Sequence, residues 1–106
     1  MRAKRTDDEH QPVLDAIRDV LGWACASLHT QGCGVEDILV AVPPKSPDFT
    51  PLWLMLEVKT ARNKRREVTP GQYTSAQLKW RNKTCGWPRI TAVDAEDAIR
   101  QLREWA

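Results

Sequence analysis

The run of residues 52–60, Leu-Trp-Leu-Met-Leu-Glu-Val-Lys-Thr, constrains the fold more than any other part of the chain. It is mostly apolar, but it is far too short to span a bilayer as a helix. Side chains alternate between the two faces of a strand. One face would hold Leu52, Leu54, Leu56 and Val58, and the other Trp53, Met55, Glu57 and Lys59. The run therefore predicts a strand whose second face ends in a carboxylate and an ammonium group.

A helix is predicted before this strand. Apolar residues recur at steps of three and four from Asp7 to about Leu28, as on the buried side of a helix. Pro12 fits only a first turn, so the helix can also begin near Gln11. The predicted apolar stripe consists of Val13, Ile17, Val20, Leu21, Ala24 and Leu28.

The remaining elements are predicted from β-branched residues and helix caps. Strands are predicted at Val35–Val42 and Arg89–Val93. A helix capped by Thr74 is predicted to run to about Thr84, with Gly86 past its end. A last helix is capped by Asp94 and has one apolar side, formed by Ala98, Ile99, Leu102 and Trp105. The whole chain, 1–106, then forms one α/β domain with the order α-β-β-α-β-α. Its expected architecture is a small mixed β-sheet flanked by helices.

The charge of the chain is unevenly distributed. The formal net charge is only +2, but residues 59–89 contain nine basic residues and one acidic residue, so this segment carries +8 and the rest carries −6. Such asymmetry favours a basic face that binds a polyanion, with nucleic acid as the first candidate, although it also fits a solvated face. The chain begins with basic residues followed by acidic ones rather than an apolar segment, so we expect an intracellular, cytoplasmic protein.

Three cysteines leave a zinc hypothesis open. Cys25, His29 and Cys33 are spaced four apart, but no Cys-x-x-Cys pair is present, and Gly32 and Gly34 favour a helix end before Cys33. Buried free thiols are the simpler interpretation, and the two histidines are expected to be structural or solvated. A zinc-stabilised interaction domain is the corresponding alternative function.

A second carboxylate gives the strand at 52–60 a chemical interpretation. Asp37 lies near the start of the preceding strand, and the start of one antiparallel strand lies beside the end of the next. Asp37 and Glu57 would then converge, with Lys59 alongside. Two close carboxylates repel each other unless a cation lies between them, and oxygen ligands favour Mg²⁺ or Mn²⁺. A metal ion with a neighbouring ammonium group is well suited to phosphodiester hydrolysis.

Three segments resemble the PD-(D/E)xK nuclease superfamily, and most closely its virus-type replication–repair nuclease (VRR-NUC) branch, related to Holliday junction resolvases. They are Gly34-Val-Glu-Asp37-Ile-Leu-Val40, Leu54-Met-Leu-Glu57-Val-Lys59-Thr60 and Thr74-Ser-Ala-Gln77-Leu-Lys-Trp80. The resemblance covers nearly the whole chain and implies a restriction-endonuclease-like core. It also implies a magnesium-dependent endonuclease acting on DNA in phage-like or bacterial replication, repair or recombination. Small relatives often act as homodimers on branched DNA, and a phage protein would work in the host cytoplasm.

The resemblance assigns roles by matching position. Asp37 and Glu57 correspond to the metal ligands, the carbonyl of Val58 to a further ligand, and Lys59 to the residue that assists the water. One departure is Glu36, because family members commonly have proline there. Strand alternation predicts that Glu36 turns to the opposite face from Asp37.

Two of the implied residues have competing interpretations. Gln77 corresponds to a helical glutamine that supports the site, but Thr74-Ser-Ala-Gln77 also fits a capping box. Superfamily members often take an additional metal-binding Glu from the first helix, here Glu9. Glu9 also fits a residue that merely interacts with the positive end of the helix dipole.

The basic residues that follow Lys59 are the expected nucleic-acid contacts. Arg62, Lys64, Arg65 and Arg66 lie in a loop directly after it, and Lys79 lies on the next helix. Tyr73 is a candidate for stacking on bases. The rival hypothesis is a non-catalytic nucleic-acid-binding module with the same fold.

Overall fold

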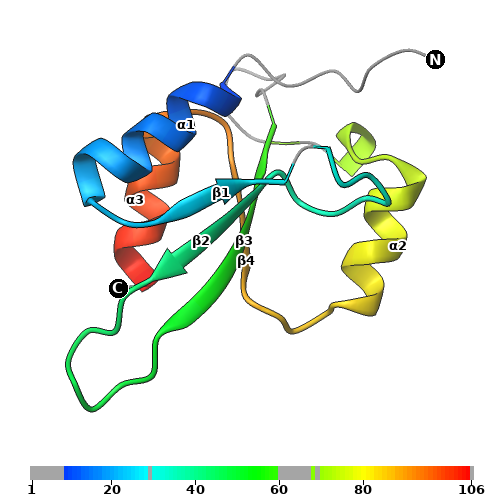
Figure 1. Ribbon diagram of the computed structural model, residues 1–106. Coiled ribbons are helices and arrows are strands. Elements are labelled where there is room, and N and C mark those ends of the chain that lie inside the picture. Colours follow the sequence, from blue (N-terminus) through cyan, green and yellow to red (C-terminus); the bar gives the residue numbers. More distant parts are fainter. Residues whose placement is uncertain (1–8, 29, 60–67, 69, 106) are drawn as a thin grey trace.

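The computed structural model describes residues 9–28, 30–59, 68 and 70–105 (Figure 1). Their elements, in chain order, are α1 (His10–Ala16), the π-helical turn η1 (Ile17–Leu21), β1 (Cys25–Ser27), β2 (Ile38–Val42), β3 (Leu52–Val58), the 3-10 turn η2 (Pro70–Gln72), α2 (Ser75–Lys83), β4 (Arg89–Ala92) and α3 (Ala95–Trp105). The α/β class and the mixed sheet flanked by helices are therefore confirmed.

The four strands form one sheet in the order β1-β2-β3-β4. β1 and β3 both pair antiparallel with β2, whereas β4 pairs parallel with β3. The parallel pair needs a crossover connection, and α2 lies within it. In Figure 1, α1 and α3 lie on one side of the sheet and α2 lies on the other.

The hydrophobic core fills the space between the sheet and the α1/α3 layer. β3 contributes Leu54, Leu56 and Val58, as its predicted apolar face requires. The other core residues come from β2, β4, α1, η1 and α3, and include Val13, Leu14, Ile17, Ile38, Val40, Ile90, Ala92, Ala98 and Leu102. The opposite side of β3 is thereby left to carry polar groups toward α2.

The predicted order α-β-β-α-β-α was wrong because it lacked β1. The first helix ends at Leu21 rather than near Leu28, since Gly22 adopts the left-handed conformation (φ 69°) that commonly terminates helices. The chain then reverses and Cys25–Ser27 pairs with β2. Ala24 is thus not part of the helical stripe, and Val20 is exposed rather than buried.

The later elements agree closely with the sequence. α2 begins after its N-cap Thr74 and ends before Thr84, as expected. Asp94 caps α3 by accepting a hydrogen bond from the Asp97 amide at 2.9 Å. The strands are shorter at their ends than predicted, since β2 begins at Ile38 rather than Val35. Among the described residues, no helix has the length and apolarity needed to cross a membrane.

Gly34 brings the loop before β2 against the start of α2. Its φ is +78°, and a β-carbon there would overlap the carbonyl of Ala76 and lie 2.6 Å from the amide nitrogen of Gln77. Only a glycine permits this backbone-to-backbone approach. The contact fixes the distance between α2 and the segment that carries Asp37.

Replacing Gly34 with alanine is expected to destabilise the protein by more than the roughly 1–2 kcal/mol of a strained φ, because the overlap with α2 is added to it. Gly22→Ala is the matched control, since Gly22 also has positive φ (+69°) but a β-carbon there would have nothing within 4 Å. Thermal unfolding of both variants would measure the difference. Equal losses of melting temperature would show that the close approach contributes nothing.

Candidate active site

Asp37 and Glu57 lie side by side at the end of β3. In the antiparallel β2–β3 pair, Ile38 lies opposite Leu56. Asp37 precedes Ile38 and Glu57 follows Leu56, so the two acidic residues lie opposite each other. One oxygen of Asp37, Oδ2, accepts a hydrogen bond from the Val58 amide at 2.9 Å. This bond closes β3 against the start of β2 and holds the Asp37 carboxylate toward its neighbour. The predicted convergence of the two carboxylates is therefore present.

Lys59 joins the pair through Gln77. The Lys59 Nζ atom donates to Gln77 Oε1 at 3.2 Å, and Gln77 Nε2 donates to Glu57 Oε1 at 3.1 Å. Nζ also lies 3.9 Å from Glu57 Oε1. Two carboxylates, an ammonium group and an amide thus form one connected cluster on the α2 side of the sheet.

The capping box predicted for Gln77 is confirmed, and its role in supporting a catalytic site stays a prediction. Gln77 Oε1 accepts a hydrogen bond from the Thr74 backbone amide at 2.9 Å, and the Gln77 backbone amide donates one to Thr74 Oγ1 at 3.1 Å. The two bonds complete a capping box. The same side chain is buried and reaches Glu57 and Lys59. The start of α2 is consequently tied to the carboxylate cluster.

The environment of Glu57 strongly favours its neutral form. The pKa of Glu57 is raised to about 8, first by burial and then by repulsion from, and a hydrogen bond with, the Asp37 carboxylate. The positive charge of Lys59 lowers this pKa, and the carboxylate of Glu36 raises it slightly. Near neutral pH, Glu57 without a bound cation therefore holds a proton.

Strand alternation predicted that Glu36 lies on the opposite face of the sheet from Asp37, and this prediction was wrong. It precedes β2, so alternation does not reach it, and its side chain is buried toward α2 and β4. Trp80 Nε1 donates to Glu36 Oε2 at 2.6 Å, and Arg89 Nε lies 3.4 Å from Oε1. Glu36 therefore connects α2 to β4 through Trp80 and Arg89.

Tyr73 and Arg81 also lie beside the cluster, although sequence reasoning gave Arg81 no individual role. The Tyr73 ring centroid is 5.5 Å from Lys59 Nζ and 4.6 Å from Arg81 Cζ. The spacing from Gln77 to Arg81, one turn of α2, is the only sequence signal that could have linked Arg81 to the site.

Glu9 directly precedes α1 and is half-buried, with no side-chain cap bond. The next residue, His10, contacts Ser27 Oγ through Nε2 at 2.9 Å, and Ser27 pairs with Ile38, which follows Asp37. The start of α1 therefore lies at the same end of the sheet as the cluster. Neither of the two roles of Glu9 is tested by these contacts.

The predicted nucleic-acid contacts are only partly visible. Arg62, Lys64, Arg65 and Arg66 lie outside the described residues, as does His29. Lys79 is exposed on α2. It is two residues from the buried Gln77, about 200° around the helix, so it faces away from the cluster. Its role as a nucleic-acid contact stays a prediction.

The cysteines differ from the buried thiols that were expected. All three are free, with Cys33 and Cys85 exposed and Cys25 half-buried. Within the described part of the chain, no group of three or more His, Cys, Asp or Glu side chains is arranged to hold a metal ion. Any metal there would depend on two carboxylates with further ligands from backbone, water or substrate.

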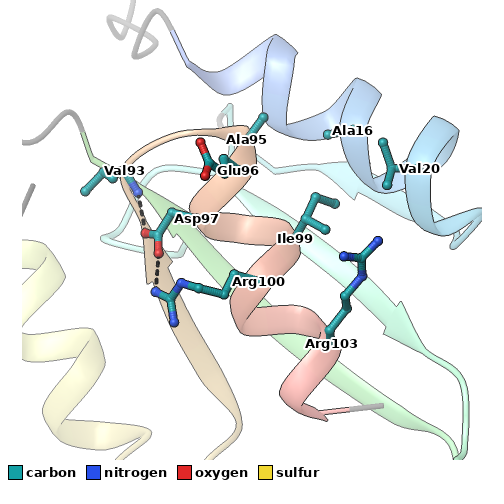
Figure 2. A pocket seen from close by; sticks show the side chains of 9 residues that line it. All are labelled: Ala16, Val20, Val93, Ala95, Glu96, Asp97, Ile99, Arg100 and Arg103. Atoms are coloured by element: carbon teal, nitrogen blue, oxygen red, sulfur yellow. Dashed lines mark hydrogen bonds and ion pairs between the residues drawn. The ribbon is translucent and has the colours of Figure 1, made fainter.

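The described hollows lie away from the carboxylate cluster. Figure 2 shows one of about 660 Å³ between α1/η1 and α3, lined by Val20 from one side and by Ile99, Arg100 and Arg103 from the other. A second, of about 340 Å³, lies near Trp23 and Trp53. The cluster lies on the other side of the sheet from the first hollow, and its Glu57 and Gln77 side chains are buried between the sheet and α2.

No family model, curated protein or solved structure matches this chain.

The stability of the metal-free protein is expected to fall as pH rises from about 5 to 8. Glu57 is protonated when folded but ionised when unfolded in this window, so the folded state binds one more proton. One proton corresponds to a slope of at most about 1.4 kcal/mol per pH unit. Melting temperatures measured in EDTA across this range would test it. Glu57→Gln should remove the slope, and an identical slope in that variant would contradict the assignment.

Proposed function

We propose that the protein is a metal-dependent endonuclease of the PD-(D/E)xK type that hydrolyses DNA phosphodiester bonds. The observation that carries this proposal is a cluster of three charged groups. The carboxylates of Asp37 and Glu57 are neighbours, and Gln77 links Glu57 to the Lys59 ammonium. The four-stranded mixed sheet is compatible with a restriction-endonuclease-like core, which we propose as the finer fold assignment.

The donor set fits a hard divalent cation. The two carboxylates repel each other strongly enough to help keep Glu57 protonated, and a bound cation would relieve this repulsion. Magnesium commonly uses one or two protein carboxylates and completes its coordination with water and substrate phosphate oxygens. Asp37, Glu57 and the carbonyl of Val58 are the proposed ligands for Mg²⁺ or Mn²⁺, with Glu9 as a further candidate.

When bound, such a metal would polarise the phosphodiester and lower the pKa of a coordinated water. The protein's own residues position the rest of the reaction. Lys59 is held by Gln77 with its charge beside Glu57, where it can orient the attacking water or offset charge that builds on phosphorus. The Val58 amide fixes the Asp37 carboxylate, so little reorganisation is required of the site during the reaction.

The charge distribution supports a nucleic-acid substrate. Residues 59–89 carry a net charge of +8, and this segment includes both Lys59 and α2. Backbone phosphates would bind exposed basic side chains of this segment without regard to sequence. A role in replication, repair or recombination, a branched DNA substrate, a homodimer and a cytoplasmic location are parts of the proposal that rest on the family resemblance.

Substitution of the carboxylates tests the proposal. Asp37→Asn and Glu57→Gln should each lower the cleavage rate by at least about 100-fold, since loss of even outer-shell partners of a metal site costs about 10- to 100-fold. Lys59→Ala should lower the rate more than it raises the magnesium requirement. The assay would use linear, flapped, nicked and four-way DNA with magnesium.

The chain offers matched controls for these changes. Glu96→Gln alters an exposed carboxylate on α3, and Lys45→Ala removes an exposed ammonium group between β2 and β3. Both should cleave at the parent rate. Unchanged rates in all three site variants, on a substrate that the parent cuts, would refute the nuclease assignment. DNA binding by the parent without cleavage under any metal would favour the binding module instead.

A further inference from the structure

Tyr73 is fixed beside the carboxylate cluster by the sheet. Its hydroxyl group forms a 3.0 Å hydrogen bond with Thr91 Oγ1, and Thr91 is the β4 partner of Glu57 in the strand register. The ring is half-buried and lies just before the N-cap of α2. Tyr73 is therefore attached to the same part of the sheet that presents Glu57.

Two cations lie against this one ring. Lys59 Nζ is 5.5 Å and Arg81 Cζ is 4.6 Å from its centroid, both within the range of cation–π attraction. Arg81 is four residues after Gln77, so the two side chains share one face of α2. The Arg81 guanidinium and the Lys59 ammonium thus share one aromatic neighbour, whereas Lys79 is exposed.

The charge of Arg81 is not neutralised within the described part of the chain. Arg89 pairs with the buried Glu36, and Arg100 pairs with Asp97 and Glu104. Among the described residues, no carboxylate or carbonyl group accepts a hydrogen bond from Arg81, whose contact is with an aromatic ring. A ring positions a guanidinium group without occupying all its N–H donors, which leaves a planar fork suited to phosphate oxygens.

We propose that Arg81 binds a backbone phosphate of the nucleic acid next to the cleaved one, and that Tyr73 positions both Arg81 and Lys59 for this purpose. The proposal rests on the proposed nuclease function and extends it. Arg81 would hold the strand, while Lys59 acts at the reacting phosphate. Cation–π attraction would favour the placement of both cations at the ring before substrate binds.

Binding measured in EDTA tests Arg81 without any cleavage. A short fluorescein-labelled duplex DNA would be titrated at several salt concentrations. Arg81→Gln should weaken binding roughly tenfold, as expected for one charge-assisted contact, and flatten the slope of log affinity against log salt by about 0.9. Arg103→Gln is the matched control, because Arg103 is exposed on α3 across the sheet. It should leave both quantities unchanged.

Cleavage kinetics test Tyr73 as a positioning residue. Tyr73→Leu removes the ring and should raise KM several-fold, whereas Tyr73→Phe keeps the ring but loses the hydrogen bond to Thr91 and should raise KM less. A purely structural role predicts a lower melting temperature with unchanged KM and salt slope. If Arg81→Gln does not fold, Arg81→Lys decides the question: a raised KM with the parent salt slope supports the contact, and an unchanged KM overturns it.

The two proposals fail in different ways. A flattened salt slope in Arg81→Gln, in a protein that cuts no DNA, would refute the nuclease and retain the phosphate contact. Parent-like slope and KM in Arg81→Gln, in a protein that does cut DNA, would refute the contact and retain the nuclease. A parent protein that binds no DNA would refute both.

Discussion

The Gln77 side chain joins two of the elements that form the candidate site, α2 and β3. Its amide contacts Thr74, Lys59 and Glu57, so a single buried group completes the start of α2 and connects it to the end of β3. In the described chain, α2 contributes no residues to the main hydrophobic core. Its position depends instead on polar contacts, namely this amide and the buried pair of Trp80 with Glu36, together with the tight backbone approach at Gly34.

The two faces of the sheet are stabilised by different kinds of contact. The face toward α1 and α3 is apolar and supplies most of the burial that stabilises the fold. The face toward α2 holds buried ionisable groups, which cost stability unless they are paired. Glu36 is paired with Arg89, whereas Glu57 carries a strongly raised pKa. Retaining such a group against its cost is common at functional sites.

The locally determined features could be predicted from the sequence. The alternation in β3, the cap of α2 at Thr74 and the cap of α3 at Asp94 each depend on residues close together in the chain. The convergence of Asp37 with Glu57 followed from antiparallel pairing of consecutive strands. Local patterns and the pairing of neighbouring strands therefore predicted that Asp37 and Glu57 lie together.

The features that were missed depend on distant contacts. β1 has three residues and little pattern of its own, so its pairing with β2 determines it, although Gly22 offered a signal for the earlier helix end. The burial of Glu36 depends on Trp80, 44 residues away in sequence. The place of Arg81 depends on the rotation of α2 against the sheet, which Gln77 sets.

The two edges of the sheet are short. β1 has three residues and β4 has four, and Pro88 directly precedes β4. Unpaired edge strands can recruit a strand from another chain, but short edges next to proline give such pairing little length to extend. The edges of the sheet, within the described part of the chain, therefore offer little backbone for pairing with a strand of another molecule.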